Sequence, residues 1–330
     1  MRTLILGDIH VSNKDEGLRQ AQINCVSKIF EEVNPDEVIQ LGDFLDFRKP
    51  SPEALLAAKS IIDLWKETSR VVILRGNHCA STKADDGVTA LSVFNDDKVK
   101  IVTHTWYDHH KKHAYIPHYE NEERIKKDLS GVPKDYTVFG HFGYFGCLNS
   151  VGDRDFTISV HSFRNNTILG HIHRQNERSF ESYGEQKRLL ILGTPYTVNF
   201  GESGKQSYYA ILDDDKLSIH EINHGPRHII ISNGDVESQI DHINDERYYT
   251  MLRVILEAGE TQTTFDNVNV ASIDVKYAPA FDEEELSTYN PSRHLFRLND
   301  VIVEDYIESA NSSIKKDKLM EGYNLLKYED

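Results

Sequence analysis

The sequence predicts a layered α/β protein in which strands and helices alternate through the first half of the chain. Short apolar runs, each followed within two residues by glycine, predict buried strands. Between them, apolar residues recur at helical spacing over 17–33 and 52–66, and Pro52 and Glu53 fit a first helical turn. Polar residues follow each strand directly. The apolar runs are 4–6, 38–41, 71–74, 138–139 and 168–169.

The second half of this layered domain is predicted to continue with strands. They are expected over 98–103 and 113–117, joined by a charged turn, and over 187–193 and 206–213. Residues 217–222 are expected to pair with the last of these across an Asp-rich turn.

A break near residues 224–226 predicts the end of the first domain. Strands over 248–257 and 268–277 then indicate a small α+β capping domain. From residue 299, two apolar stripes separated by a polar break predict a C-terminal helical hairpin. The predicted domains are 1–224, 225–290 and 291–330.

Composition restricts the function. The chain has 330 residues, a formal net charge of −16 and three cysteines. An odd, scattered set of cysteines predicts no disulfide framework and suits a reducing cytosol. No apolar run approaches the length of a membrane span, so no membrane association is expected. The negative charge argues against a surface that coats nucleic acid, but a nuclease site can draw its positive charge from metal ions and a partner.

The polar residues after the strands form a set of metal ligands. They occur in the segments Gly7-Asp8-Ile9-His10, Gly42-Asp43, Gly76-Asn77, Gly140-His141 and Gly170-His171-Ile172-His173. Ligands bind beyond the carboxyl ends of strands in open α/β sheets. Oxygen and imidazole ligands without cysteine suit Mn, Fe, Zn or Mg. A purely structural role would leave seven polar side chains at buried strand ends without partners, which is costly.

This order of motifs resembles that of the calcineurin-like metallophosphoesterases, over about residues 1–202. The resemblance implies a β-sandwich flanked by helices and a site for two divalent metal ions, with Mn²⁺ as the first expectation and Mg²⁺ as the second. It also implies that a water activated by the metals is the nucleophile. Asp43 would bridge the ions. Metal one would also take Asp8, His10 and His173, and metal two would also take Asn77, His141 and His171.

The resemblance also implies two catalytic residues. His78 would contact the phosphate and stabilise or protonate the leaving oxygen. Asp46 would orient His78, although it is also placed to cap the next helix or to pair with Arg48. Cys79 stands where many family members have an acid, so this position is either structural or His78 is held differently. His118 is expected to end a strand near the rim of the site.

A narrower resemblance points to the SbcD/Mre-type DNA nucleases, in their compact bacteriophage-type form. It rests on Asp-Phe-Arg-Lys-Pro-Ser at 46–51 and on Gly-Thr-Pro-Tyr at 193–196 followed by Asn-Phe-Gly-Glu at 199–202. It implies a DNA exonuclease or endonuclease in the cytoplasm, of the host cell if phage-encoded. Residues 299–328 would dock on an SbcC-type ATPase. The alternative is a stand-alone small-molecule or protein phosphatase of the same fold.

The resemblance further implies a homodimer formed through the helix at 52–66. Because this helix carries apolar residues on more than one face, we expect that Leu56, Ile62 or Trp65 is buried between subunits. The alternative is that all three pack on the central sheet.

Overall fold

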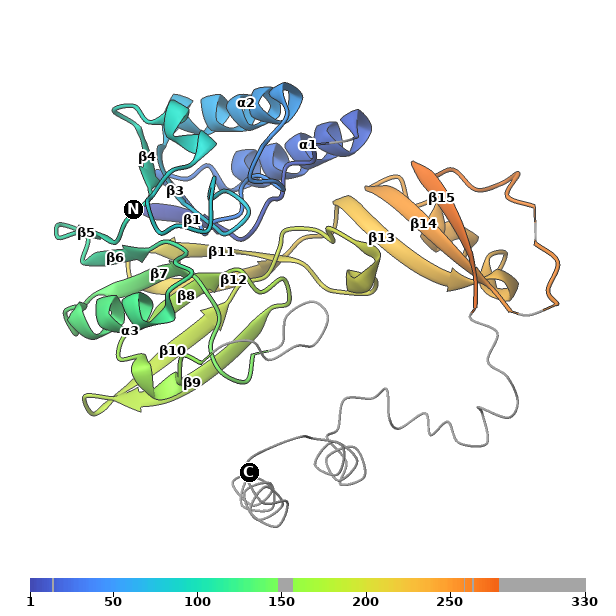
Figure 1. Cartoon of the computed structure of the whole chain (residues 1–330). Helices are drawn as coiled ribbons and strands as arrows, with labels where there is room; N and C mark the ends of the chain where they lie inside the picture. The colour runs from blue at the N-terminus through green and yellow to red at the C-terminus, as the bar shows by residue number, and fades with distance from the viewer. Residues whose placement is uncertain (14, 148–156, 258, 263, 279–330) are drawn as a thin grey trace, which may run out of the picture. The chain divides into compact units, whose positions relative to one another are not determined.

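Two stacked sheets form the centre of the computed structural model, which describes all residues except 14, 148–156, 258, 263 and 279–330 (Figure 1). The first sheet has the order β12-β11-β1-β2-β3-β4. Its strands β1 to β4 run parallel. At one edge, β11 pairs antiparallel with β1, and β12 pairs antiparallel with β11. The strands are β1 (Arg2–Leu6), β2 (Glu37–Gln40), β3 (Arg70–Leu74), β4 (Val99–Val102), β11 (Tyr208–Asp213) and β12 (Lys216–Glu221).

The second sheet has the order β5-β6-β7-β8-β10-β9. Strands β6, β7, β8 and β10 are parallel, and β5 and β9 close the two edges as antiparallel partners. The strands are β5 (Trp106–Asp108), β6 (His113–Ile116), β7 (Thr137–His141), β8 (Thr167–Gly170), β9 (Asn176–Ser182) and β10 (Glu185–Ile191).

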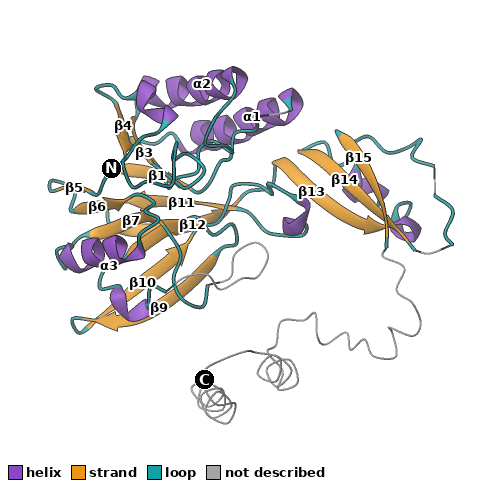
Figure 2. Ribbon diagram, viewed as in Figure 1, coloured by secondary structure: helices purple, strands orange, loops and turns teal. Residues whose placement is uncertain are grey.

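Alternating side chains hold the two sheets and their helices together. In β1, Ile5 faces the second sheet, whereas Leu4 and Leu6 face the helices, as the two-residue period of a strand requires. The helices α1 (Glu16–Val33) and α2 (Pro52–Thr68) cover the first sheet, and α3 (Glu122–Gly131) covers the second (Figure 2). The layers therefore run helix, sheet, sheet, helix, which confirms the predicted fold class.

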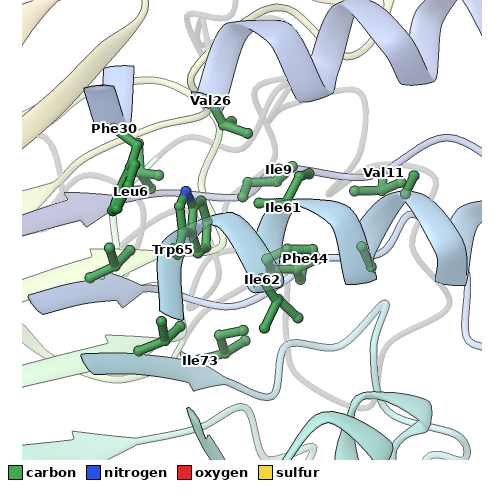
Figure 3. Close-up of a cluster of buried hydrophobic side chains, with 14 of the residues drawn as sticks. Leu6, Ile9, Val11, Val26, Phe30, Phe44, Ile61, Ile62, Trp65 and Ile73 are labelled. Carbon is green, nitrogen blue, oxygen red and sulfur yellow. The ribbon is translucent and has the colours of Figure 1, made fainter. Parts of the chain in front are cut away.

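Helix α2 shows how the sequence sets these elements. Ser51 caps its N-terminus by accepting a hydrogen bond from the Ala54 amide, and Pro52 occupies the first turn. Trp65 is fully buried and packs edge to face against Phe44, with the ring centroids 5.8 Å apart (Figure 3). Burial of such side chains stabilises the fold by about 1.5–3 kcal/mol each.

The dimer stays a prediction, and the structure narrows the residues that could carry it. Ile62 and Trp65 are buried in the core beneath α2. Leu56 alone of the three is exposed, at 64%. The apolar stripe of α2 fills the space above the first sheet, so the alternative that all three residues pack on this sheet holds for Ile62 and Trp65 but not for Leu56.

Most predicted strands are present, with two differences in their arrangement. The strands at 98–103 and 113–117 appear as β4 and β6, but they lie in different sheets, and β5 forms the hairpin with β6. The pairing of 206–213 with 217–222 is confirmed by β11 and β12. Strands β5 and β9 and helix α3 were not predicted, and neither was a strand at Gly225–Ser232. Strand β9 and helix α3 are largely polar: β9 is an edge strand, and α3 buries only Ile125 and Leu129.

A third sheet follows at residue 225. It contains three parallel strands, β13 (Gly225–Ser232), β14 (Tyr248–Leu256) and β15 (Ser272–Tyr277), with a core of its own. The short helix α4 (Ile240–Ile243) lies between β13 and β14. Residues 1–277 form one compact unit, so the division at 224/225 stays a prediction.

The predicted hairpin at 299–328 and the acidic run at 282–285 lie outside the described residues. Within the part that is described, no helix combines the length and the apolar content needed to cross a bilayer.

Candidate metal centre

The seven predicted ligands come together at the carboxyl ends of the parallel strands. The loops after β1, β2 and β3 bring them from the first sheet, and β7 and the loop after β8 bring them from the second. Three of the seven adopt left-handed backbone conformations that non-glycine residues rarely take: His10 at φ 49°, Asp43 at φ 47° and His171 at φ 80°. Such strain clusters at functional sites.

Two motif glycines are needed because ligand side chains approach their backbone closely. A Cβ added at Gly42, whose φ is 110°, would lie 2.2 Å from Nδ1 of His141. A Cβ at Gly76 would lie 2.1 Å from Oδ1 of Asp43. Both distances are far below contact, so glycine at these positions is a steric condition for assembling the site.

The first group of ligand atoms contains Asp8, His10 and His173. Nε2 of His10 lies 3.1 Å from Nε2 of His173, and Nε2 of His173 lies 3.8 Å from Oδ2 of Asp8. Asp8 is held in place by the His171 amide, which donates to its carboxylate at 3.0 Å. These residues are the ones predicted for metal one.

The second group contains Asp43, Asn77, His141 and His171. Oδ1 of Asn77 lies 3.1 Å from Nε2 of His141 and 2.9 Å from Nδ1 of His171. Oδ2 of Asp43 lies 3.3 Å from Nε2 of His141. These residues are the ones predicted for metal two.

Asp43 stands between the two groups. Its Oδ1 accepts a hydrogen bond from the His78 amide at 2.8 Å, which fixes the carboxylate. Its Oδ2 faces both groups, 3.3 Å from Nε2 of His141 and 3.9 Å from Nε2 of His10. One carboxylate is therefore placed to be shared.

The charges of the site favour an ionised Asp43. Burial raises the pKa of Asp43, but His141 and His10 outweigh it and hold the pKa well below its ordinary value. Burial lowers the pKa of His141, yet the carboxylates of Asp43 and Asp8 raise it to about 9. Burial and the neighbouring His141 lower the pKa of His171 well below its usual range.

These features fit metal ions. Nδ1 of His141 donates to the Leu41 carbonyl at 2.7 Å, so its Nε2 carries either a lone pair or the proton of an imidazolium. Asp43 and Asn77 direct only oxygen atoms at that nitrogen. A cation held by His141, Asp43 and Asn77 would take the place of that proton, since metal binding releases protons from its ligands.

His78 and Asp46 form a third group of possible ligand atoms together with His10, in an arrangement that the sequence did not predict. The backbone carbonyl of Asp46, and not its carboxylate, accepts from Nδ1 of His78 at 2.7 Å. The Asp46 carboxylate instead lies 3.3 Å from Nδ1 of His10. Because a carbonyl only accepts, Nδ1 of His78 carries a proton, and Nε2 is the nitrogen left to contact a phosphate.

Neither alternative for Asp46 holds. Ser51 caps helix α2, and Arg48 pairs with Glu120 at 3.1 Å. Asp46 thus contacts one predicted metal ligand with its side chain and one predicted catalytic residue with its main chain.

Cys79 is a core residue. Its side chain is 2% exposed and packs in the cluster beneath α1 and α2. Its sulfur accepts from the Leu45 amide at 3.4 Å, and burial raises the pKa of the thiol. A buried, protonated thiol is neither a nucleophile nor a metal ligand, which supports the structural reading of this position.

His118 lies at the site, as expected. Its ring stacks on that of His171 with centroids 5.8 Å apart. The histidines of the 104–113 region join none of the metal-binding groups among the described residues.

Glu202 is the residue that sequence reasoning missed. Its Oε1 accepts from Nδ1 of His173 at 2.5 Å, and it is buried together with Lys205, 2.8 Å away. Burial raises the pKa of Glu202, but His173 and Lys205 lower it to about 2, so it is a carboxylate. A carboxylate on the distal nitrogen of a ligating histidine is a common feature of metal sites. The signal was its place at the end of the Asn-Phe-Gly-Glu segment, 29 residues after His173.

Comparison with known proteins identifies the family of this chain. No curated protein matches the chain. Among solved structures, an archaeal phosphodiesterase is 14% identical over 67% of this chain and 99% of that chain, with a TM-score of 0.34. The nuclease MPE of Pseudomonas putida is 16% identical over 66% of this chain and 87% of that chain, with a TM-score of 0.32. The model of the calcineurin-like phosphoesterases matches residues 1–272, well over half of the chain. The chain therefore belongs to the calcineurin-like phosphoesterases, a family of metal-dependent enzymes.

Proposed function

We propose that this chain is a di-metal phosphodiesterase that hydrolyses DNA as the nuclease subunit of an SbcCD/Mre-type complex with an ATPase partner. The phosphodiesterase part rests on the placement of Asp43 between two groups of oxygen and imidazole ligands. Its Oδ2 lies 3.9 Å from Nε2 of His10 and 3.3 Å from Nε2 of His141. Two divalent ions, Mn²⁺ foremost, would supply Lewis-acid charge and lower the pKa of the attacking water.

The chain's own residues then have separate tasks. Asp8, His10 and His173 would hold one ion, Asn77, His141 and His171 the other, and Asp43 both. Nε2 of His78 would contact the phosphate or the leaving oxygen, because its Nδ1 is committed to the Asp46 carbonyl. No serine or cysteine nucleophile is required, and Cys79 is buried away from the site.

The surface beside His78 supports a nucleic-acid substrate. A cavity of about 450 Å³ is lined by Asp46, Phe47, Arg48, Lys49 and His78. Phe47 is 40% exposed and is followed in the sequence by Arg48 and Lys49, of which Arg48 is paired with Glu120. An aromatic ring among basic side chains is the combination with which proteins bind single strands, by stacking on a base and pairing with the backbone.

The ATPase-dependent role is supported by the sequence. Residues 46–51 and 193–202 resemble the SbcD/Mre-type nucleases, and residues 299–328 carry the pattern of a docking hairpin. The net charge of −16 also favours a partner, since duplex affinity depends on phosphate neutralisation by Lys and Arg. The rival, a stand-alone phosphatase, explains the acidic surface without a partner but gives no role to the hairpin.

A paired assay distinguishes these functions. The purified chain with Mn²⁺ is given linear duplex DNA, a short single strand and p-nitrophenyl phosphate, each with and without the cognate ATPase and ATP. A nuclease subunit should cleave the single strand alone and the duplex much faster with the ATPase. Rapid hydrolysis of the monoester with no cleavage of either DNA would favour the phosphatase.

A further inference from the structure

One short segment of the chain contacts a predicted metal ligand on one side and the third sheet on the other. It spans residues 197–205 and includes the single-turn helix η3 (Phe200–Glu202). On the metal side, Glu202 accepts a hydrogen bond from His173. On the sheet side, Thr197 and Ser203 bind the backbone of β13. The two sets of contacts lie within nine residues of one another.

The metal-side contact is held firmly. The Glu202 side chain is 2% exposed, and its Oε2 accepts from Nζ of Lys205 at 2.8 Å and from the Val198 amide at 3.1 Å. Lys205 is itself 6% exposed and donates to the Tyr196 carbonyl and the Thr194 hydroxyl. With both carboxylate oxygens engaged, the position of Glu202 follows the position of the segment.

On the sheet side, the segment binds β13, which is at the edge of the third sheet. The amide of His228 donates to Oγ1 of Thr197 at 2.6 Å, and the amide of Ile230 donates to Oγ of Ser203 at 2.9 Å. The centroid of the Phe200 ring lies 4.8 Å from the centroid of the His228 ring and 4.0 Å from Cζ of Arg253. The segment is thus fastened to β13 and β14 by hydrogen bonds and by packing.

We propose that Glu202 is the positioning residue for metal one, and that the 197–205 segment couples the affinity of that metal to the placement of the third sheet. The proposal rests on the two-metal site of the proposed function. An imidazole that ligates through Nε2 is oriented by the partner on Nδ1, and loss of such partners weakens metal binding about 10–100-fold. Because coupling is reciprocal, an ion bound at metal one also strengthens the seating of the third sheet on the segment.

The first test measures metal affinity directly. Mn²⁺ is titrated into the full chain by calorimetry, for the wild type and for Glu202→Gln. We expect one of two binding events to weaken about 10–100-fold and the other to stay unchanged. The same titration on a His171→Ala background, which lacks a ligand of the second group, assigns the weakened event to metal one. Glu177→Gln is the matched control, since it removes the same charge from an exposed ion pair with Arg188.

Loss of the buried partner of Lys205 also threatens the fold, so a second variant is needed. Glu202→Gln combined with Lys205→Met removes both charges together, and thermal unfolding of the metal-free chain checks its stability. The double variant should regain stability without regaining the metal affinity. Full metal-one affinity in a folded Glu202→Gln chain would overturn the positioning role, whereas a wild type that binds no pair of ions would overturn the proposed function instead.

The second test addresses coupling. Thr197→Val with Ser203→Ala removes both hydroxyls that bind β13 and leaves Glu202 intact. We expect metal one to bind several-fold more weakly, and no further loss when Glu202→Gln is already present, because both changes act through one path. Ser232→Ala, at the far end of β13, is the control and should change nothing. Unchanged affinity in the hydroxyl variant, or full additivity with Glu202→Gln, would refute the coupling.

Discussion

At the residue scale, His78 separates chemistry from metal binding. Its ring donates to the Asp46 carbonyl and its amide donates to Asp43, and its side chain lies with His10 and Asp46 in a group outside the predicted ligand set. His78→Ala should lower the turnover about 10²–10⁴-fold, the range expected for one acid or electrostatic group, with both ions still bound. Steady-state kinetics with elemental analysis of the same sample measures both quantities. Loss of an ion from this variant would show that His78 is a ligand.

Which residues assemble the site could be predicted from the sequence, because each ligand follows an apolar run and a glycine. The contacts around them could not. The Asp46 carboxylate turned to His10 and not to His78, since three residues of separation leave the side-chain direction open. Glu202 reaches His173 across a long stretch of chain, and no local periodicity indicates such a contact.

At the element scale, β6 carries a buried histidine that should make stability depend on pH. Burial, aided by Lys111, lowers the pKa of His113 from 6.5 to about 4. Between pH 4 and pH 6.5 this histidine binds a proton in the unfolded chain but not in the folded chain. The free energy of unfolding is therefore highest above pH 6.5 and falls as the pH falls towards 4. The shift in the pKa of His113 lowers the free energy of unfolding over this pH range by at most about 3 kcal/mol.

Urea unfolding of the metal-free chain tests this. His113→Phe should flatten the fall in the free energy of unfolding between pH 6.5 and 4, while exposed His110→Phe should leave the slope of the wild type. If the free energy of unfolding falls equally with pH in the wild type and in His113→Phe, His113 is not the source of the pH dependence.

Helix α2 offers a narrower dimer surface than the sequence predicted, since only Leu56 of the three residues is exposed. If α2 pairs between subunits, Leu56→Glu should convert a dimer to a monomer in light scattering at tens of micromolar, with little change in thermal stability. Tyr183→Glu, an exposed residue at the β9–β10 turn, should leave the dimer intact. A wild-type chain that is already monomeric would refute the dimer prediction.

Two of the missed elements share a physical cause, whereas the largely buried β13 was missed because Gly225 and Pro226 at its start indicate a break. Strand β9 and helix α3 are polar over most of their length and are stabilised by the sheet beside them, so their own sequences carry little periodic signal. The buried strands were predictable because both of their faces are covered and their apolar runs are continuous.

At the scale of the whole molecule, we expect that the predicted C-terminal hairpin can be removed without loss of a metal ligand, because every predicted ligand lies within residues 8–173. Truncation after Leu298 should abolish association with the ATPase and ATP-stimulated duplex degradation. It should spare Mn²⁺-dependent cleavage of a short single strand. Gel filtration with the ATPase and the two DNA assays measure this. A truncated chain that still assembles and degrades duplex normally would show that the ATPase docks elsewhere.

The proposed phosphodiesterase mechanism depends on two ions sharing Asp43, and the Mn²⁺ content per chain tests that sharing most directly. The wild type should bind two Mn²⁺ ions by elemental analysis after equilibrium dialysis. Asp43→Asn keeps the shape of the side chain but removes the charge that both groups face, so it should lose at least one ion and most of its turnover while remaining folded. Two ions bound to Asp43→Asn, together with normal turnover, would contradict the shared site.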